Sequence, residues 1–107
     1  MHQELGPGLL ESTYESCLVQ EFVLDGVEFI RQVPVPVTYR GLTLDCAYRA
    51  DLVIEGELLL EIKSVDQLAP IHQAQLLTYL KLLGLRQGML MNFNCRRLVD
   101  GLRNVLL

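Results

Sequence analysis

Apolar residues at helical spacing predict two helices in this chain. In residues 9–24 they recur every three or four positions, for example at Leu10 and Tyr14, which gives a helix one apolar face. Residues 70–83 form the second expected helix, and Pro70 suits its first turn, where no free N–H group is needed. A glycine follows each segment closely and tolerates the left-handed backbone that commonly ends a helix.

Short apolar segments between and after these helices predict a β-sheet. The expected strands are residues 27–33, 35–39, 42–54, 57–63 and 89–93. The longest of them is expected to bend near residues 46–48, and Pro34 and Pro36 indicate a kink or a sheet edge. Residues 98–107 are ambiguous: Gly101 argues against a strong helix, and a final strand is the alternative. The order of the elements predicts an α/β sandwich with a mixed sheet.

Length and hydropathy favour one small domain that pairs with a second copy. The chain has 107 residues, half of them hydrophobic, and we expect a single domain over residues 1–107. Its mean hydropathy of +0.28 is high for a domain of this size. A partner subunit that covers part of the apolar surface would explain this value, so we expect a homodimer.

The chain lacks the sequence features of membrane and secreted proteins. No apolar run approaches the ~18 residues of a membrane span, and residues 1–4 do not begin a secretory signal. Cys17, Cys46 and Cys95 are widely spaced and odd in number, which fits free thiols better than disulfides or a zinc site. We therefore expect a cytoplasmic protein with no membrane partner.

The net negative charge of the chain limits the ways in which it can bind nucleic acid. The net charge is −4, whereas proteins that coat nucleic acid non-specifically are usually basic. A site that holds a divalent cation remains compatible with this charge, because the ion reverses the local sign.

Three charged residues stand inside segments that are otherwise apolar. Asp51 precedes the run 52–54, while Glu61 and Lys63 flank Ile62 after three leucines. An acidic side chain buried in a strand costs several kcal/mol unless it is paired or binds a metal ion. Because residues two apart in a strand point to one face, Glu61 and Lys63 share a face. The alternative is that Asp51 is exposed at a strand end and Glu61 and Lys63 form a solvated pair.

The turn at Glu55 and Gly56 decides whether Asp51 joins that face. A two-residue loop would set Asp51 and Glu61 on opposite faces. A three-residue loop over residues 54–56 would pair Asp51 with Leu59, and the two carboxylates would then be diagonal neighbours roughly 7 Å apart or less. A single bulge has the same effect. We therefore predict an odd loop or a bulge.

Such a site suits metal-assisted hydrolysis of a phosphodiester. Two carboxylates, from Asp51 and Glu61, together with the backbone carbonyl of Ile62 provide the oxygen ligands that Mg²⁺ or Mn²⁺ prefers. Lys63 would lie beside the ion, where it can orient an attacking water or help to deprotonate it.

Both expected helices carry polar pairs at helical spacing. In the first helix Glu11 and Tyr14 are three residues apart, and in the second helix Gln75 and Tyr79 are four apart. The simpler interpretations are that Glu11 stabilises the helix N-terminus and that Gln75 and Tyr79 form a polar, half-buried helix edge.

Taken together, these motifs resemble the GxxExxY protein family, which is grouped with the PD-(D/E)XK nuclease-like superfamily. In order, the motifs are Gly8-x-x-Glu11-x-x-Tyr14, Asp51, Glu61-x-Lys63 and Gln75-x-x-x-Tyr79. The resemblance covers nearly the whole chain. It departs from the usual pattern in having Ala50 before the aspartate and little sequence before Gly6.

The resemblance implies a restriction-endonuclease-like fold with an αβββαβ core, in which helices flank a mixed β-sheet. The implied metal ligands are Asp51, Glu61 and Glu11, and the implied catalytic residues are Asp51, Glu61 and Lys63. The residues implied to line the site or to bind substrate are Gln75, Tyr79 and Tyr14.

Two functions follow as hypotheses. The first is a nuclease that depends on Mg²⁺ or Mn²⁺ and acts on nucleic acid. The second is a non-catalytic dimeric module for binding or assembly on the same fold, which the acidic charge and the high hydropathy favour.

Overall fold

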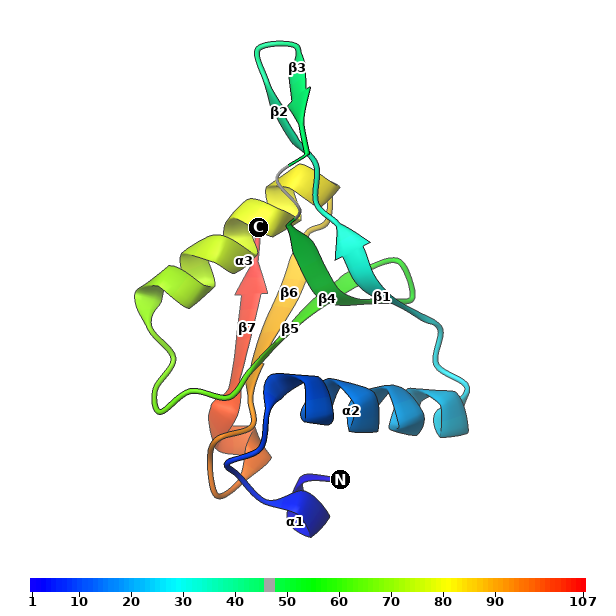
Figure 1. Cartoon of the computed structure of the whole chain (residues 1–107), viewed down its shortest axis with the longest axis vertical. Coiled ribbons are helices and arrows are strands. Elements are labelled where there is room, and N and C mark those ends of the chain that lie inside the picture. Colours follow the sequence, from blue (N-terminus) through cyan, green and yellow to red (C-terminus); the bar gives the residue numbers. More distant parts are fainter. Residues whose placement is uncertain (46–47) are drawn as a thin grey trace.

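A computed structural model describes residues 1–45 and 48–107 of the chain (Figure 1). Its helices are α1 (His2–Leu5), α2 (Glu11–Asp25), α3 (Pro70–Leu83) and the 3₁₀ helix η1 (Leu98–Gly101). Its strands are β1 (Phe29–Pro34), β2 (Val37–Tyr39), β3 (Leu42–Leu44), β4 (Arg49–Ile54), β5 (Leu58–Lys63), β6 (Gln87–Asn92) and β7 (Leu102–Leu106). Both predicted helices are therefore confirmed.

Five strands form one mixed sheet in the order β1-β4-β5-β6-β7. β5 and β6 are parallel, whereas the other neighbouring pairs are antiparallel. α3 makes the crossover between the two parallel strands, as parallel pairing requires. β1 is an edge strand, which explains how its last residue, Pro34, is accommodated without a free N–H group.

The helices α2 and α3 cover opposite faces of this sheet (Figure 1). Leu60 packs in the core beneath α2, while its neighbour Leu59 packs in the core beneath α3, because successive side chains of a strand alternate between faces. Gly88 on β6 lets α3 come close, since a Cβ atom there would lie 3.0 Å from the side chain of Leu76.

The structure corrects the sequence prediction at several elements. The predicted strand over residues 42–54 is two strands, β3 and β4, which belong to different sheets. The bend expected near residues 46–48 falls partly outside the described residues, as does Cys46; Cys17 and Cys95 are free and half-buried. The ambiguous C-terminal segment contains the strand β7, which confirms the strand alternative.

The short helix α1 was not predicted from sequence, and a long-range hydrogen bond holds it. His2 is buried, and its Nε2 atom lies 2.9 Å from the carbonyl oxygen of Phe93. Within the described residues, no helix is long and apolar enough to cross a bilayer.

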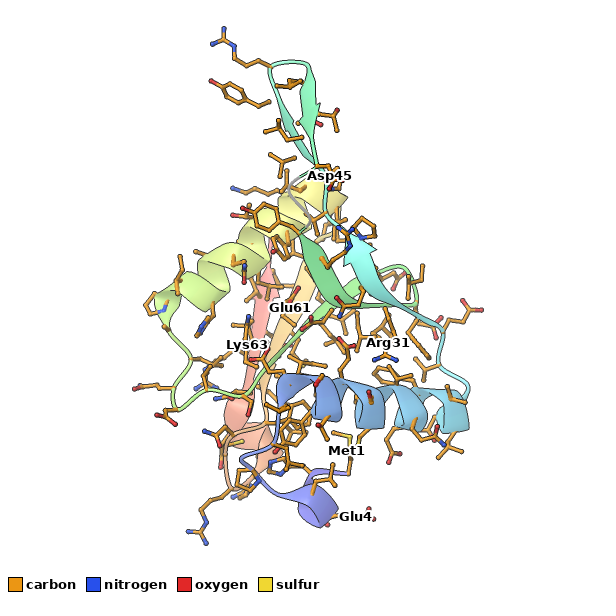
Figure 2. All side chains as sticks on the ribbon, viewed as in Figure 1. Met1, Glu4, Arg31, Asp45, Glu61 and Lys63 are labelled. Atoms are coloured by element: carbon orange, nitrogen blue, oxygen red, sulfur yellow. The ribbon has the colours of Figure 1, made fainter. Side chains whose placement is uncertain are left out.

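A buried carboxylate fastens α2 to the edge strand β1. Glu15 accepts a hydrogen bond of 2.8 Å from the Arg31 guanidinium and another of 2.8 Å from the Gln32 side-chain amide. In Figure 2 the side chain of Arg31 points from β1 toward α2. Gln32 has a φ of 51°, an uncommon conformation for a residue other than glycine, which lets two successive side chains of β1 reach one carboxylate.

Candidate functional site

The turn between β4 and β5 places the two predicted carboxylates at one level of the sheet. Ile54 pairs with Leu58 and Leu52 pairs with Leu60, so three residues separate the paired strands and the predicted odd loop is confirmed. The register itself differs from the prediction. Its continuation sets Asp51 opposite Glu61 rather than opposite Leu59, and both side chains share the α3 face of the sheet.

Hydrogen bonds from the backbone hold the two acids where the β4–β5 ladder ends. The N–H group of Ile62 donates to Oδ2 of Asp51 over 2.7 Å. The N–H group of Asp51 donates to Oε1 of Glu61 over 3.4 Å. Each carboxylate therefore satisfies a backbone donor of the opposite strand, which fixes the orientation of both side chains.

Glu61 is held in a setting that favours its protonated form. Its side chain lies in the core with only 5% of the residue exposed. Burial, together with the negative charge and side-chain hydrogen bonding of Asp51, raises the pKa of Glu61 from 4.5 to about 9, against the opposing charge of Lys63. Without a cation, the pair therefore retains a proton at neutral pH.

Lys63 ends β5, and Glu11 accepts a hydrogen bond from the residue that follows it. Lys63 follows Glu61 by two residues, is partly buried and lies along β5 in the region between α3 and α2 (Figure 2). The next residue, Ser64, donates its N–H group to Oε2 of Glu11 over 3.2 Å, and its hydroxyl donates to the Leu9 carbonyl over 2.8 Å. The start of α2 is thus tied to the strand that carries Glu61 and Lys63.

The predicted pair on α3 is formed and faces the carboxylates. The Gln75 amide donates to the Tyr79 hydroxyl over 3.3 Å. Burial is the largest cause that raises the pKa of Tyr79. The charges of Glu61, Tyr48 and Asp51 raise this pKa as well. Tyr79 is therefore the side chain that links α3 electrostatically to the acidic pair.

Tyr14 occupies a different position from the site-lining one that its motif implies. Its ring is 0% exposed and stacks on Phe93 with ring centroids 4.5 Å apart. Its hydroxyl donates to the Gly6 carbonyl over 2.5 Å and accepts from the Leu9 N–H group over 3.1 Å. Tyr14 therefore acts on the site only through the turn that precedes α2.

Two residues near the site were not singled out from sequence. Tyr48 precedes β4, and its ring lies 6.2 Å from that of Tyr79. Asn92, buried at the end of β6, accepts from the Val65 N–H group over 3.1 Å and donates to the Val65 carbonyl over 3.0 Å. A polar residue that ends a buried strand was the available signal for Asn92; Tyr48 offered none beyond its aromatic ring.

The donor set fits a divalent cation bound through oxygen atoms. Among residues 1–45 and 48–107, no group of three or more His, Cys, Asp or Glu side chains is arranged to hold a metal ion. Mg²⁺ commonly takes only one or two carboxylates and completes its shell with waters and substrate phosphates. Asp51 and Glu61 meet that requirement, and a cation would supply the positive charge that this buried pair lacks.

Comparison with known protein families matched nearly the whole chain. The profile of the PD-(D/E)XK nuclease superfamily matches residues 1–105, nearly the full chain. The mixed five-stranded sheet with flanking helices is consistent with the restriction-endonuclease-like fold of that superfamily. The comparisons with curated proteins and with solved structures gave no match.

Proposed function

Because the chain belongs to the PD-(D/E)XK nuclease superfamily, we propose that it hydrolyses phosphodiester bonds of nucleic acid with Mg²⁺ or Mn²⁺. The observation that carries this proposal is the pair formed by Asp51 and Glu61, two carboxylates on one face of a sheet, one of them deeply buried. A pair of acids with no function beyond the fold would only destabilise it, because burial of their charge is not compensated. A pair that awaits a cation explains both the burial and the raised pKa of Glu61.

We propose the following division of roles. Asp51 and Glu61 would hold the cation, and a bound cation would supply Lewis-acid chemistry for the scissile phosphate and for the attacking water. Lys63 orients the attacking water or helps to deprotonate it, and it neutralises charge beside Glu61. Glu11 can join as a third ligand if it releases the Ser64 N–H group; until then it holds the end of β5.

Single substitutions test these roles. Asp51→Ala and Glu61→Ala are expected to abolish binding of Mn²⁺ in titration calorimetry. Lys63→Ala is expected to retain metal binding and to lower the cleavage rate by about 10²- to 10⁴-fold, the usual range for loss of a proton-transfer group. Glu57→Ala is the matched control, because Glu57 is an exposed carboxylate in the same turn.

The cleavage assay should present single- and double-stranded DNA and RNA, each with Mg²⁺ or Mn²⁺. Activity that survives in Asp51→Ala and Glu61→Ala would contradict the assignment of the site. Wild-type affinity for Mn²⁺ in both variants would contradict it as well.

A second function, a non-catalytic dimeric module for binding or assembly, is favoured by the β2–β3 hairpin. The hairpin exposes 63% of Tyr39 and 59% of Leu42, a combination typical of contact surfaces. Under this alternative the purified protein forms a stable dimer and cleaves no nucleic acid with either metal ion.

A further inference from the structure

A pocket of about 720 Å³ is lined by α3, by the first residue of β2 and by the residue that precedes β4. One face of α3 forms one wall, and Val37 and Tyr48 contribute from the other side. The lining is mainly apolar, with a few polar groups from α3. Pockets of this size and composition hold small planar ligands or parts of larger ones.

This pocket adjoins the carboxylate pair through a shared side chain. Tyr79 lines the pocket and packs in the same core cluster as Val53 and Leu59, whose side chains lie on the sheet face that carries Asp51 and Glu61. A substrate phosphate at the carboxylates would therefore have its neighbouring nucleotide within reach of the pocket.

Tyr48 contributes a partly exposed aromatic ring to the lining of the pocket. Its residue is 46% exposed, and its ring is tilted by 54° against that of Tyr79. The Tyr48 carbonyl accepts the Val35 N–H group over 3.0 Å, which anchors the backbone of this residue. An anchored, half-exposed ring is a ready surface for stacking a base.

Two residues one turn apart on α3 add hydrogen-bonding groups. The Nδ1 atom of His72 accepts the Ala69 N–H group over 2.9 Å, so its Nε2 atom carries the proton of the neutral ring and can donate. Gln75 uses its amide nitrogen toward Tyr79, and its amide oxygen is an acceptor. His72 and Gln75 thus present one donor and one acceptor to the same pocket.

The charge around this pocket disfavours recognition through the phosphate backbone. In the described part of the chain, the residues that line it include no Lys and no Arg, and the whole chain has a net charge of −4. Duplex binders derive most of their affinity from cationic contacts with phosphates. A neutral, planar base with donor and acceptor edges matches the lining better.

We infer that the pocket receives an unpaired nucleobase of the substrate, stacked on Tyr48 and within hydrogen-bonding reach of His72 and Gln75. The inference rests on the proposed nuclease function and specifies its substrate class: single-stranded nucleic acid, or a strand whose target nucleotide has left the base stack. A paired base inside a duplex cannot enter such a pocket without being flipped out.

Fluorescence anisotropy tests this inference with labelled DNA and RNA strands of about ten nucleotides, in Ca²⁺ so that cleavage does not interfere. Single strands should bind more tightly than the matching duplexes. Tyr48→Ala should weaken single-strand binding by roughly 5- to 150-fold, the range for loss of one base–aromatic stack. An abasic strand should bind weakly and respond little to Tyr48→Ala. Leu106→Ala, at an exposed hydrophobic residue of β7 that does not line the pocket, is the control.

Equal binding of single strand and duplex, or an unchanged affinity in Tyr48→Ala, would overturn the inference, as would the absence of oligonucleotide binding when metal is bound. Calorimetry with Mn²⁺ separates this failure from failure of the proposed function. If wild type and Tyr48→Ala both bind Mn²⁺ through Asp51 and Glu61 but their affinity for the strand does not depend on the base, only the pocket assignment fails. If wild type binds no Mn²⁺, the proposed function itself fails.

Discussion

Glu61 shows how a single residue can couple folding to proton binding. In the folded chain its pKa is raised to about 9 from an ordinary value of 4.5. The folded state therefore binds the proton more tightly than the unfolded state does. The stabilisation that this protonation provides is complete below about pH 4.5 and is lost as the pH rises toward 9.

Glu61→Gln is expected to remove this pH dependence. Without divalent cations, at about pH 8, the variant should be more stable than wild type by at least about 1 kcal/mol, because glutamine cannot ionise in the buried position. Chemical denaturation between about pH 5 and 9 in a chelating buffer measures the difference. Glu57→Gln, at an exposed position, should follow the wild-type profile. Parallel profiles for Glu61→Gln and wild type would contradict the coupling.

The candidate site was predictable from sequence as far as local rules reach. Polar residues inside apolar strands pointed to Asp51 and Glu61, and strand alternation placed Lys63 on the face of Glu61. The exact partners across the hairpin were not predictable, because Glu55 and Gly56 both adopt positive φ and the turn spans residues 55–57 rather than 54–56, which shifts the pairing by two residues on β5. The burial of Tyr14 depends on how α2 is rotated against the sheet, which the motif spacing does not determine.

At the scale of elements, α2 is held to the sheet by one buried carboxylate as well as by apolar packing. Glu15 bonds to both Arg31 and Gln32, two successive residues of β1. In the pairing of β1 with β4, Arg31 pairs with Leu52 and Val33 pairs with Ala50. Gln32, which lies between them, has no regular partner on β4. The strained backbone at Gln32 is thus maintained from outside the strand, by the helix.

Glu15→Ala is expected to lower the free energy of unfolding by about 1–3 kcal/mol, the range for hydrogen bonds to a charged group, because it leaves two donors without their acceptor. Arg31 is partly exposed, which keeps the loss below that of a fully buried pair. Denaturant titration measures this change in the free energy of unfolding. Glu21→Ala, at an exposed position of the same helix, should change stability by less than about 0.5 kcal/mol. Equal losses in both variants would contradict the role of Glu15.

Elements with their own periodicity were predictable, and elements defined by distant contacts were not. The helix α3 has the predicted limits because Pro70 and Gly84 mark its ends locally. The helix α1 depends on a bond between His2 and Phe93, 91 residues apart in sequence. The division of residues 42–54 into β3 and β4 likewise follows from separate partners, β2 and β1.

At the scale of the whole molecule, the β2–β3 hairpin projects from the body of the protein (Figure 1). It forms a sheet of two strands that is separate from the main sheet. Two-stranded hairpins are marginally stable alone in water, and this one exposes apolar side chains at Tyr39 and Leu42. A second copy of the chain is the partner that we propose for this surface.

Light scattering coupled to size exclusion tests that assembly. The wild-type chain is expected to elute as a dimer at micromolar concentration, and the double substitution Tyr39→Ser with Leu42→Ser is expected to elute as a monomer. Leu106→Ser is the matched control, because Leu106 is an exposed hydrophobic residue on the edge strand β7. A monomeric wild type, or a double variant that remains dimeric, would contradict the role of the hairpin.

The three-residue turn between β4 and β5 also restricts how the gene can change. If the turn keeps its length of three residues, loss or gain of one codon there shifts the pairing by one residue and inverts the alternation of one strand relative to the other. Asp51 and Glu61 would then lie on opposite faces of the sheet. If β5 were the strand that turned over, a core leucine such as Leu60 would leave its place beneath α2. Such an allele would fail by misfolding before selection could act on its chemistry. Lineages that retain this fold should therefore change the length of the turn by pairs of residues, or keep it constant.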